Sequence, residues 1–133
     1  MREINLIVIH CTATRPSMDI GAAEIRQWHK ARGFRTIGYH YVVRLDGTIE
    51  RGRSEYQMGA HCAGYNAFSL GICYVGGLNQ QGEPADTRTQ AQRRSLQRLV
   101  NELKKKYPLA RVVGHCDLNK HKACPCFDVA TSL

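Results

Sequence analysis

The sequence lacks any long apolar run. No stretch approaches the roughly 18 consecutive apolar residues of a membrane-spanning helix, so we expect no membrane insertion. The first ten residues, MREINLIVIH, also lack the apolar core and small-residue cleavage site of a secretory signal peptide, and we expect synthesis in the cytoplasm. Repeats, linkers and low-complexity segments are missing too. A length of 133 residues, 43% of them hydrophobic, therefore indicates a single domain.

Acidic side chains are few. The chain has 11 aspartates and glutamates against 19 lysines and arginines, which gives a formal net charge of +8 at pH 7. A surface of this sign attracts polyanions such as nucleic acid, anionic lipid or an acidic cell-wall polymer, and charge alone does not choose between them. The six cysteines belong to a chain without a secretory signal, so we expect thiols or metal ligands rather than disulfides.

Hydrophobic patterning predicts strands that alternate with helices. The run Leu6–Ile9 indicates a strand buried on both faces, with His10 at its carboxyl end, where sites gather on open sheets. The other expected elements are a helix from about Ile20 to Arg32 between an Asp19 cap and Gly33, a hairpin of Tyr39–Leu45 and Thr48–Glu50 around Asp46-Gly47, a strand at Leu70–Val75, a helix between a Thr89 cap and Pro108, and a strand at Arg111–Gly114.

Side-chain spacing predicts which faces are buried. Gly21, Ile25 and Trp28 share one face of the first helix, and Tyr39, Tyr41 and Val43 share one face of the hairpin. The inner stripe of the second helix is Leu96, Leu99, Val100, Leu103 and Tyr107, and Thr89 with Gln92 fits a capping box. The segment from Arg51 to Ser69 has no periodicity, and its Gly, Ser, Asn and His content predicts a long ordered loop with a functional role.

Two histidines and a cysteine make a candidate metal site. His10 and His115 each follow an apolar strand, and Cys124 lies nine residues after His115 in a segment too irregular for a core. A catalytic zinc ion takes three protein ligands and keeps a fourth position open for water. Tyr39 and Lys122 are candidate hydrogen-bond donors beside such a metal, because one opens the hairpin and the other lies two residues before Cys124.

Spacing alone leaves two rival sites open. His115, His121, Cys124 and Cys126 can form a closed structural zinc site, although the single residue between the two cysteines is shorter than such sites prefer. Alternatively, Cys124 or Cys62 can act as a nucleophile beside a histidine, as in a cysteine hydrolase.

Five motifs, in order, carry a resemblance over essentially the whole chain. The motifs are VIHCTAT (8–14), EIRQWHKARGF (24–34), GYHYVVRLDGTIERGR (38–53), GAHCAGYNAFSLGICYVGG (59–77) and GHCDLNKHKACPCFDV (114–129). Together they resemble the zinc-dependent N-acetylmuramoyl-L-alanine amidases of the bacteriophage-lysozyme and peptidoglycan-recognition-protein type. The resemblance implies one α/β domain over residues 1–133, with a central mixed β-sheet flanked by helices and a zinc site in a surface groove.

The resemblance also implies roles for individual residues. By analogy, His10, His115 and Cys124 are the ligands of one zinc ion, and Tyr39 and Lys122 are the catalytic residues. In that family, a zinc-activated water attacks the amide between N-acetylmuramic acid and L-alanine, while the Tyr and Lys position the water and stabilise the oxyanion. The segment GAHCAGYN resembles the wall of the groove, so His61 and Asn66 are expected to contact substrate or shape the groove.

Two positions depart from the family pattern. Cys116 stands where relatives often have Arg, and Cys126 where a small residue is usual, so thiols crowd Cys124 on both sides. We expect a monomeric phage or prophage endolysin that acts on the cell wall after release, with peptidoglycan as its substrate and no need for nucleic acid. The alternative is a peptidoglycan-binding module without catalysis; regulation of a phage polymerase, a trait of some relatives, is not carried by any motif.

Overall fold

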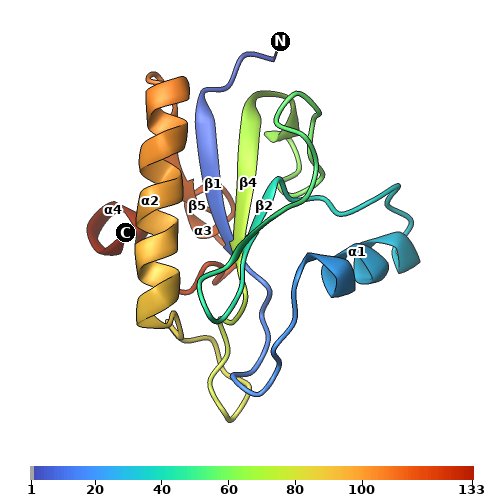
Figure 1. Cartoon of the computed structure of the whole chain (residues 1–133), viewed down its shortest axis with the longest axis vertical. Coiled ribbons are helices and arrows are strands. Elements are labelled where there is room, and N and C mark those ends of the chain that lie inside the picture. The colour runs from blue at the N-terminus through green and yellow to red at the C-terminus, as the bar shows by residue number, and fades with distance from the viewer. Residues whose placement is uncertain (1) are drawn as a thin grey trace.

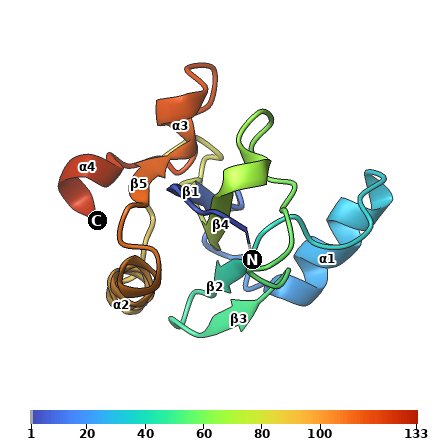
Figure 2. The same cartoon turned by 90° about the horizontal axis from the view of Figure 1, so that it is seen from above.

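Five strands form one mixed sheet in the order β3-β2-β4-β1-β5. Figure 1 shows β2, β4, β1 and β5, and Figure 2 also shows β3. The computed structural model describes residues 2–133. The strand bounds are β1 (Leu6–Cys11), β2 (Tyr41–Val43), β3 (Ile49–Arg51), β4 (Ser69–Tyr74) and β5 (Arg111–Gly114). Strands β2, β4, β1 and β5 run parallel, and β3 pairs antiparallel with β2 through the expected hairpin. The α/β class and the mixed sheet expected from the sequence are confirmed.

Strand β1 lies between two parallel neighbours, as its apolar run predicts. Ile7 and Ile9 pack in the larger core, whereas Leu6 and Val8 pack in a smaller cluster on the other face. Successive side chains of a strand alternate between faces, so His10 continues the row of Leu6 and Val8. His10 therefore projects from the face of the sheet that the larger core leaves uncovered.

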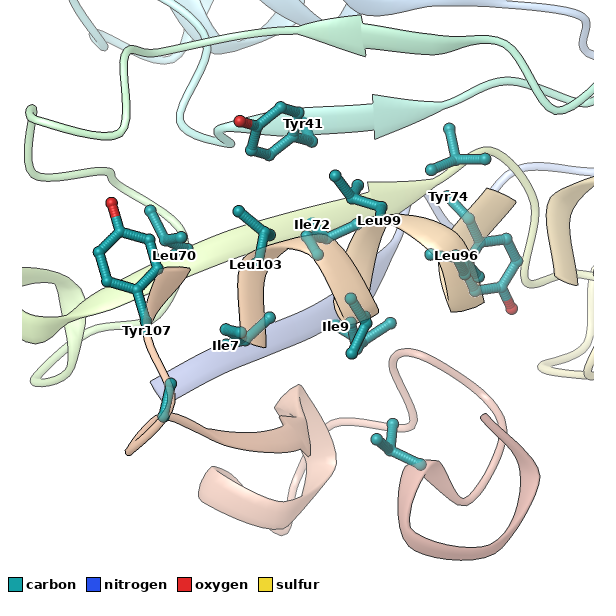
Figure 3. Packing of buried hydrophobic residues seen from close by; sticks show 14 of the residues in the cluster. Ile7, Ile9, Tyr41, Leu70, Ile72, Tyr74, Leu96, Leu99, Leu103 and Tyr107 are labelled. Carbon is teal, nitrogen blue, oxygen red and sulfur yellow. The ribbon is translucent and has the colours of Figure 1, made fainter. Parts of the chain in front are cut away.

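Helix α2 (Gln90–Lys106) covers the larger core. Its predicted stripe is buried against β1 and β4, as Figure 3 shows for Leu96, Leu99 and Leu103. The capping box is present, because Gln92 N–H donates to Thr89 Oγ1 and Thr89 N–H donates to Gln92 Oε1. In Figure 2, α2 lies on the opposite side of the sheet from α3 (His115–Leu118), which keeps the His10 face clear of the long helix.

Helix α1 (Ala22–Ala31) starts later than predicted. Gly21 rather than Asp19 is the N-cap residue, and the Asp19 carboxylate lies 3.5 Å from the Arg44 guanidinium instead. The expectation that Trp28 is buried is also wrong: it is 40% exposed. The predicted end is confirmed, since Gly33 has a φ of +96° just after the last turn.

The buried face of α1 consists of Ala22, Ile25 and His29. Ala22 and Ile25 belong to a hydrophobic cluster that includes Val42 of β2, and Tyr39 packs against this cluster. Tyr39 therefore does not share a face with Tyr41 and Val43, because the chain is irregular before β2 begins.

Short elements close the fold. The 3₁₀ turn Asn66–Phe68, α3 and α4 (Val129–Ser132) span three or four residues each, too few for a hydrophobic period to reveal them in the sequence. Within residues 2–133, no helix combines the length and the apolar character that a membrane crossing requires.

A half-buried carboxylate fastens the 52–68 loop to α2. Glu55 accepts hydrogen bonds from Tyr41 Oη, from Tyr107 Oη at 2.8 Å and from Lys106 Nζ at 2.9 Å. Burial alone would raise the pKa of Glu55, but these three donors outweigh burial and lower the pKa below its ordinary value. The loop that carries His61 is thus held in part by the ammonium of Lys106, the last residue of α2.

Replacing Glu55 by glutamine should lower the free energy of unfolding by about 2 kcal/mol at pH 7, because hydrogen bonds to a charged acceptor are the stronger kind. A depressed folded-state pKa stabilises the protein above the ordinary carboxyl pKa of about 4.3, and that contribution is lost as the pH falls through the folded-state pKa. Urea unfolding at several pH values should show a weaker acid dependence for Glu55→Gln. Glu3→Gln, at an exposed carboxylate, is the matched control; equal stability of both variants would contradict the assignment.

Candidate metal centre and groove

Three candidate ligands meet at the carboxyl ends of two parallel strands. Ile9 of β1 pairs with Gly114 of β5, so the residues that follow them, His10 and His115, become neighbours with ring centroids 4.7 Å apart. Cys124 approaches from the segment between α3 and α4. The ligand atoms of the three residues all lie within 4.8 Å of one another.

Contacts with β1, β4 and α3 hold Cys124 and the next residue in place. Cys11 N–H donates to Cys124 Sγ at 3.1 Å, and Cys116 N–H donates to the Cys124 carbonyl at 2.8 Å. One residue further on, Tyr74 Oη donates to the Pro125 carbonyl at 2.6 Å. The Cys124 sulfur consequently lies 3.8 Å from His10 Nδ1.

Burial keeps the histidines neutral. His10 is 1% exposed, and burial, followed by the charges of His61 and His115, holds its pKa well below the ordinary value. The pKa of His115 is lowered by burial and then by the Lys122 ammonium. Neutral imidazoles have the lone pair that a metal needs. Two such imidazoles and one thiol match the donor set of a three-ligand zinc site with an open position.

These donors open into a groove of about 630 Å³. Its lining includes the four residues expected from the resemblance to be catalytic or substrate-binding: Tyr39, His61, Asn66 and Lys122. A cavity of this size accommodates part of an extended ligand. The structure thus brings the seven candidate residues to one concave surface.

The groove also has a wall that sequence reasoning missed. His29, Arg32 and Phe34 contribute from the end of α1 and the turn after it. His29 Nδ1 accepts a hydrogen bond from Gly38 N–H at 2.9 Å, and its ring lies 5.4 Å from that of Tyr39. The sequence contains one signal for this wall: His29 lies four residues after Ile25 and so falls on the apolar face of the helix.

Tyr39 and Lys122 flank the candidate ligands differently. The Tyr39 ring centroid lies 5.1 Å from that of His10. Burial raises the pKa of Tyr39 well above its ordinary value, so its hydroxyl remains a proton donor. Lys122 is exposed at the edge of the groove, close enough to His115 to affect its pKa.

His61 and Asn66 are linked to each other. Asn66 Oδ1 accepts hydrogen bonds from the backbone N–H groups of His61, at 3.0 Å, and Cys62, at 2.9 Å. The Asn66 oxygen therefore shapes the groove wall. His61 lies deeper, with its Nδ1 2.8 Å from His10 Nε2. Burial, followed by nearby positive charges, lowers the pKa of His61 to about 3.

The four-ligand zinc site and a Cys62 nucleophile receive no structural support, whereas a Cys124 nucleophile beside His10 is left to the chelator test below. Within residues 2–133, the group of His, Cys and acidic side chains placed to share a metal is His10, His115 and Cys124, and neither His121 nor Cys126 belongs to it. Cys62 is 5% exposed, and burial raises the pKa of its thiol, which disfavours a thiolate nucleophile.

Comparisons with known proteins identify the family and the fold. The family model described as N-acetylmuramoyl-L-alanine amidase matches residues 1–127. The chain is 45% identical to the endolysin of Klebsiella phage KP32, over 96% of this chain and 84% of that protein, and 45% identical to the endolysin of Escherichia phage T7, over 92% and 81%. Its fold is similar to the solved amidase LysC from Clostridium intestinale, with a TM-score of 0.81 and 35% identity over 96% of this chain and 79% of that one.

Proposed function

Because the chain belongs to the N-acetylmuramoyl-L-alanine amidase family, we propose that its groove holds one zinc ion between His10, His115 and Cys124 for amide hydrolysis. The protein is a phage-endolysin-type enzyme that cleaves the bond between N-acetylmuramic acid and L-alanine in peptidoglycan. The observation that carries the metal assignment is the convergence of three donors, two neutral imidazoles and one thiol, within 4.8 Å at a groove.

The three donors would hold the metal, and two further residues would act on the substrate. When bound, zinc supplies a Lewis acid that polarises the scissile carbonyl and lowers the pKa of a water molecule. The Tyr39 hydroxyl, kept protonated by burial, donates a hydrogen bond toward the carbonyl oxygen as it gains negative charge. The Lys122 ammonium adds a positive charge at the edge of the groove, and the two donors together stabilise the oxyanion and orient the water.

The groove wall would bind the rest of the muramyl peptide. Asn66 shapes the loop through its backbone hydrogen bonds, and the loop presents His61 and its neighbours to the groove. The Arg32 guanidinium, exposed in the groove lining just after α1, gives the groove a positive charge that suits the carboxylates of a stem peptide.

At the level of the whole protein, we propose that the 133 residues form one amidase domain and work as a monomer without nucleic acid. The endolysin relatives indicate action on the cell wall. We propose synthesis in the bacterial cytoplasm followed by release, with the net charge of +8 keeping the enzyme near its anionic substrate.

Two measurements on one purified sample test the function. We expect about one zinc ion per chain, and new L-alanine amino termini released from purified peptidoglycan. A chelator should abolish release, and added zinc should restore it. Zinc without release would favour a binding module or a structural site, whereas release that a chelator leaves unchanged would favour a cysteine hydrolase.

A further inference from the structure

Each nitrogen of His10 has a partner. His10 Nδ1 faces Cys124 Sγ at 3.8 Å, on the side of the candidate metal. The other nitrogen, Nε2, lies 2.8 Å from His61 Nδ1, and His61 Nε2 in turn lies 3.1 Å from Ser69 Oγ. Three side chains thus form a line from the metal centre into the sheet.

The number of protons on each ring determines which atom donates and which accepts along this line. A neutral imidazole has one N–H and one lone pair. If Nδ1 of His10 offers its lone pair to the metal, the proton is on Nε2, and His61 Nδ1 must accept it. The proton of His61 is then on Nε2 and is donated to the Ser69 hydroxyl. The hydrogen bonds are consistent with one tautomer of each ring.

The fold makes room for the His61 ring at one position of β4. A Cβ atom added at Gly71 would lie 2.6 Å from His61 Cγ and 2.8 Å from Nδ1. Gly71 is paired with Val8 in the centre of the sheet. With Asn66 holding the His61 backbone, the ring is fixed from three sides: by Gly71, by Ser69 and by the loop.

We propose that His61 is a positioning residue of the metal centre, which holds His10 in the Nε2–H tautomer with Nδ1 directed at the metal, and that Ser69 orients His61 in the same way. The inference deepens the proposed function and rests on it. It assigns His61 a role distinct from substrate contact: the acceptor behind a ligating histidine, usually a carboxylate or a carbonyl, is here a neutral imidazole.

The test compares zinc affinity among His61 variants, measured by competition with a chromophoric chelator. His61→Phe keeps a ring but removes the acceptor, and we expect zinc binding to weaken by about 10- to 100-fold. His61→Asn places an amide oxygen near the position of Nδ1 and should recover most of the affinity. His121→Ala, at an exposed histidine outside the group, is the control and should bind zinc as the wild type does.

A second readout follows the tautomer itself. Imidazole ¹⁵N shifts of the zinc-loaded wild type should report His10 as the Nε2–H form with Nδ1 bound, and the His61→Phe spectrum should show that arrangement disturbed. Equal zinc affinity in the wild type, His61→Phe and His61→Asn would overturn the inference and leave the zinc site intact, whereas a wild type without zinc would refute the proposed function as well. If His61→Phe fails to fold, the comparison passes to Ser69→Ala, which should weaken zinc binding a few-fold; unchanged affinity there would overturn the inference.

Discussion

Replacing Cys124 by serine is expected to remove most of the bound zinc and the hydrolysis of peptidoglycan together. A serine hydroxyl stays protonated near neutral pH, so the centre would lose its one thiolate and keep two neutral imidazoles. The loss of a direct ligand should exceed the roughly 10- to 100-fold weakening that follows from removing an outer-shell partner. Metal content after dialysis and release of L-alanine termini are the two measurements.

Neighbouring thiols supply the controls for this result. Cys126 Sγ lies 3.9 Å from Cys11 Sγ, and Cys116 is half-buried beside the same segment. Cys126→Ser and Cys116→Ser should keep about one zinc ion per chain. If Cys124→Ser retained all its zinc while one of these variants lost it, the ligand role would move to that cysteine.

Replacing Lys122 by alanine should leave zinc in place and reduce turnover by about 10²- to 10³-fold, the cost of removing one oxyanion donor. The side chain is exposed and belongs to no buried cluster, so a loss of stability is not expected. The measurement is kcat for L-alanine release, with metal content determined on the same protein. Loss of zinc instead of turnover would assign Lys122 to metal binding.

Lys120, two residues earlier and also exposed, provides a matched control, because Lys120→Ala removes an equal charge from the same segment. Its turnover should stay close to that of the wild type. Tyr39→Phe should also retain zinc while losing turnover. If the two donors act on one oxyanion, combining Lys122→Ala with Tyr39→Phe should cost less than the product of the single effects.

Long periodic segments made most of the fold predictable. The unbroken run Leu6–Ile9 indicates a strand buried on both faces, and the stripe of α2 is long enough for its period to specify one buried face. The errors lie where tertiary contacts compete with local preference. Asp19 is a good N-cap residue, yet its carboxylate pairs with Arg44, and the chain enters α1 at Gly21.

Only part of the site could be predicted from the sequence. Strand ends placed His10 and His115, because parallel strands in register bring their following residues together. The position of Cys124 depends on contacts with residues distant in the sequence, such as the hydrogen bond from Tyr74 Oη to the Pro125 carbonyl at 2.6 Å. No local pattern encodes such a contact. The link between His61 and His10 was likewise invisible, since it joins side chains 51 positions apart.

The space above Gly71 has a consequence for engineering. A common route to a more heat-resistant protein replaces glycines inside regular elements by alanine, which limits the freedom of the unfolded chain. In the middle of β4 this substitution would press a methyl group into the His61 ring. The absence of a side chain at Gly71 leaves the space that the His61 ring occupies, so on the proposed role of His61 a stabilising Gly71→Ala design would weaken zinc binding.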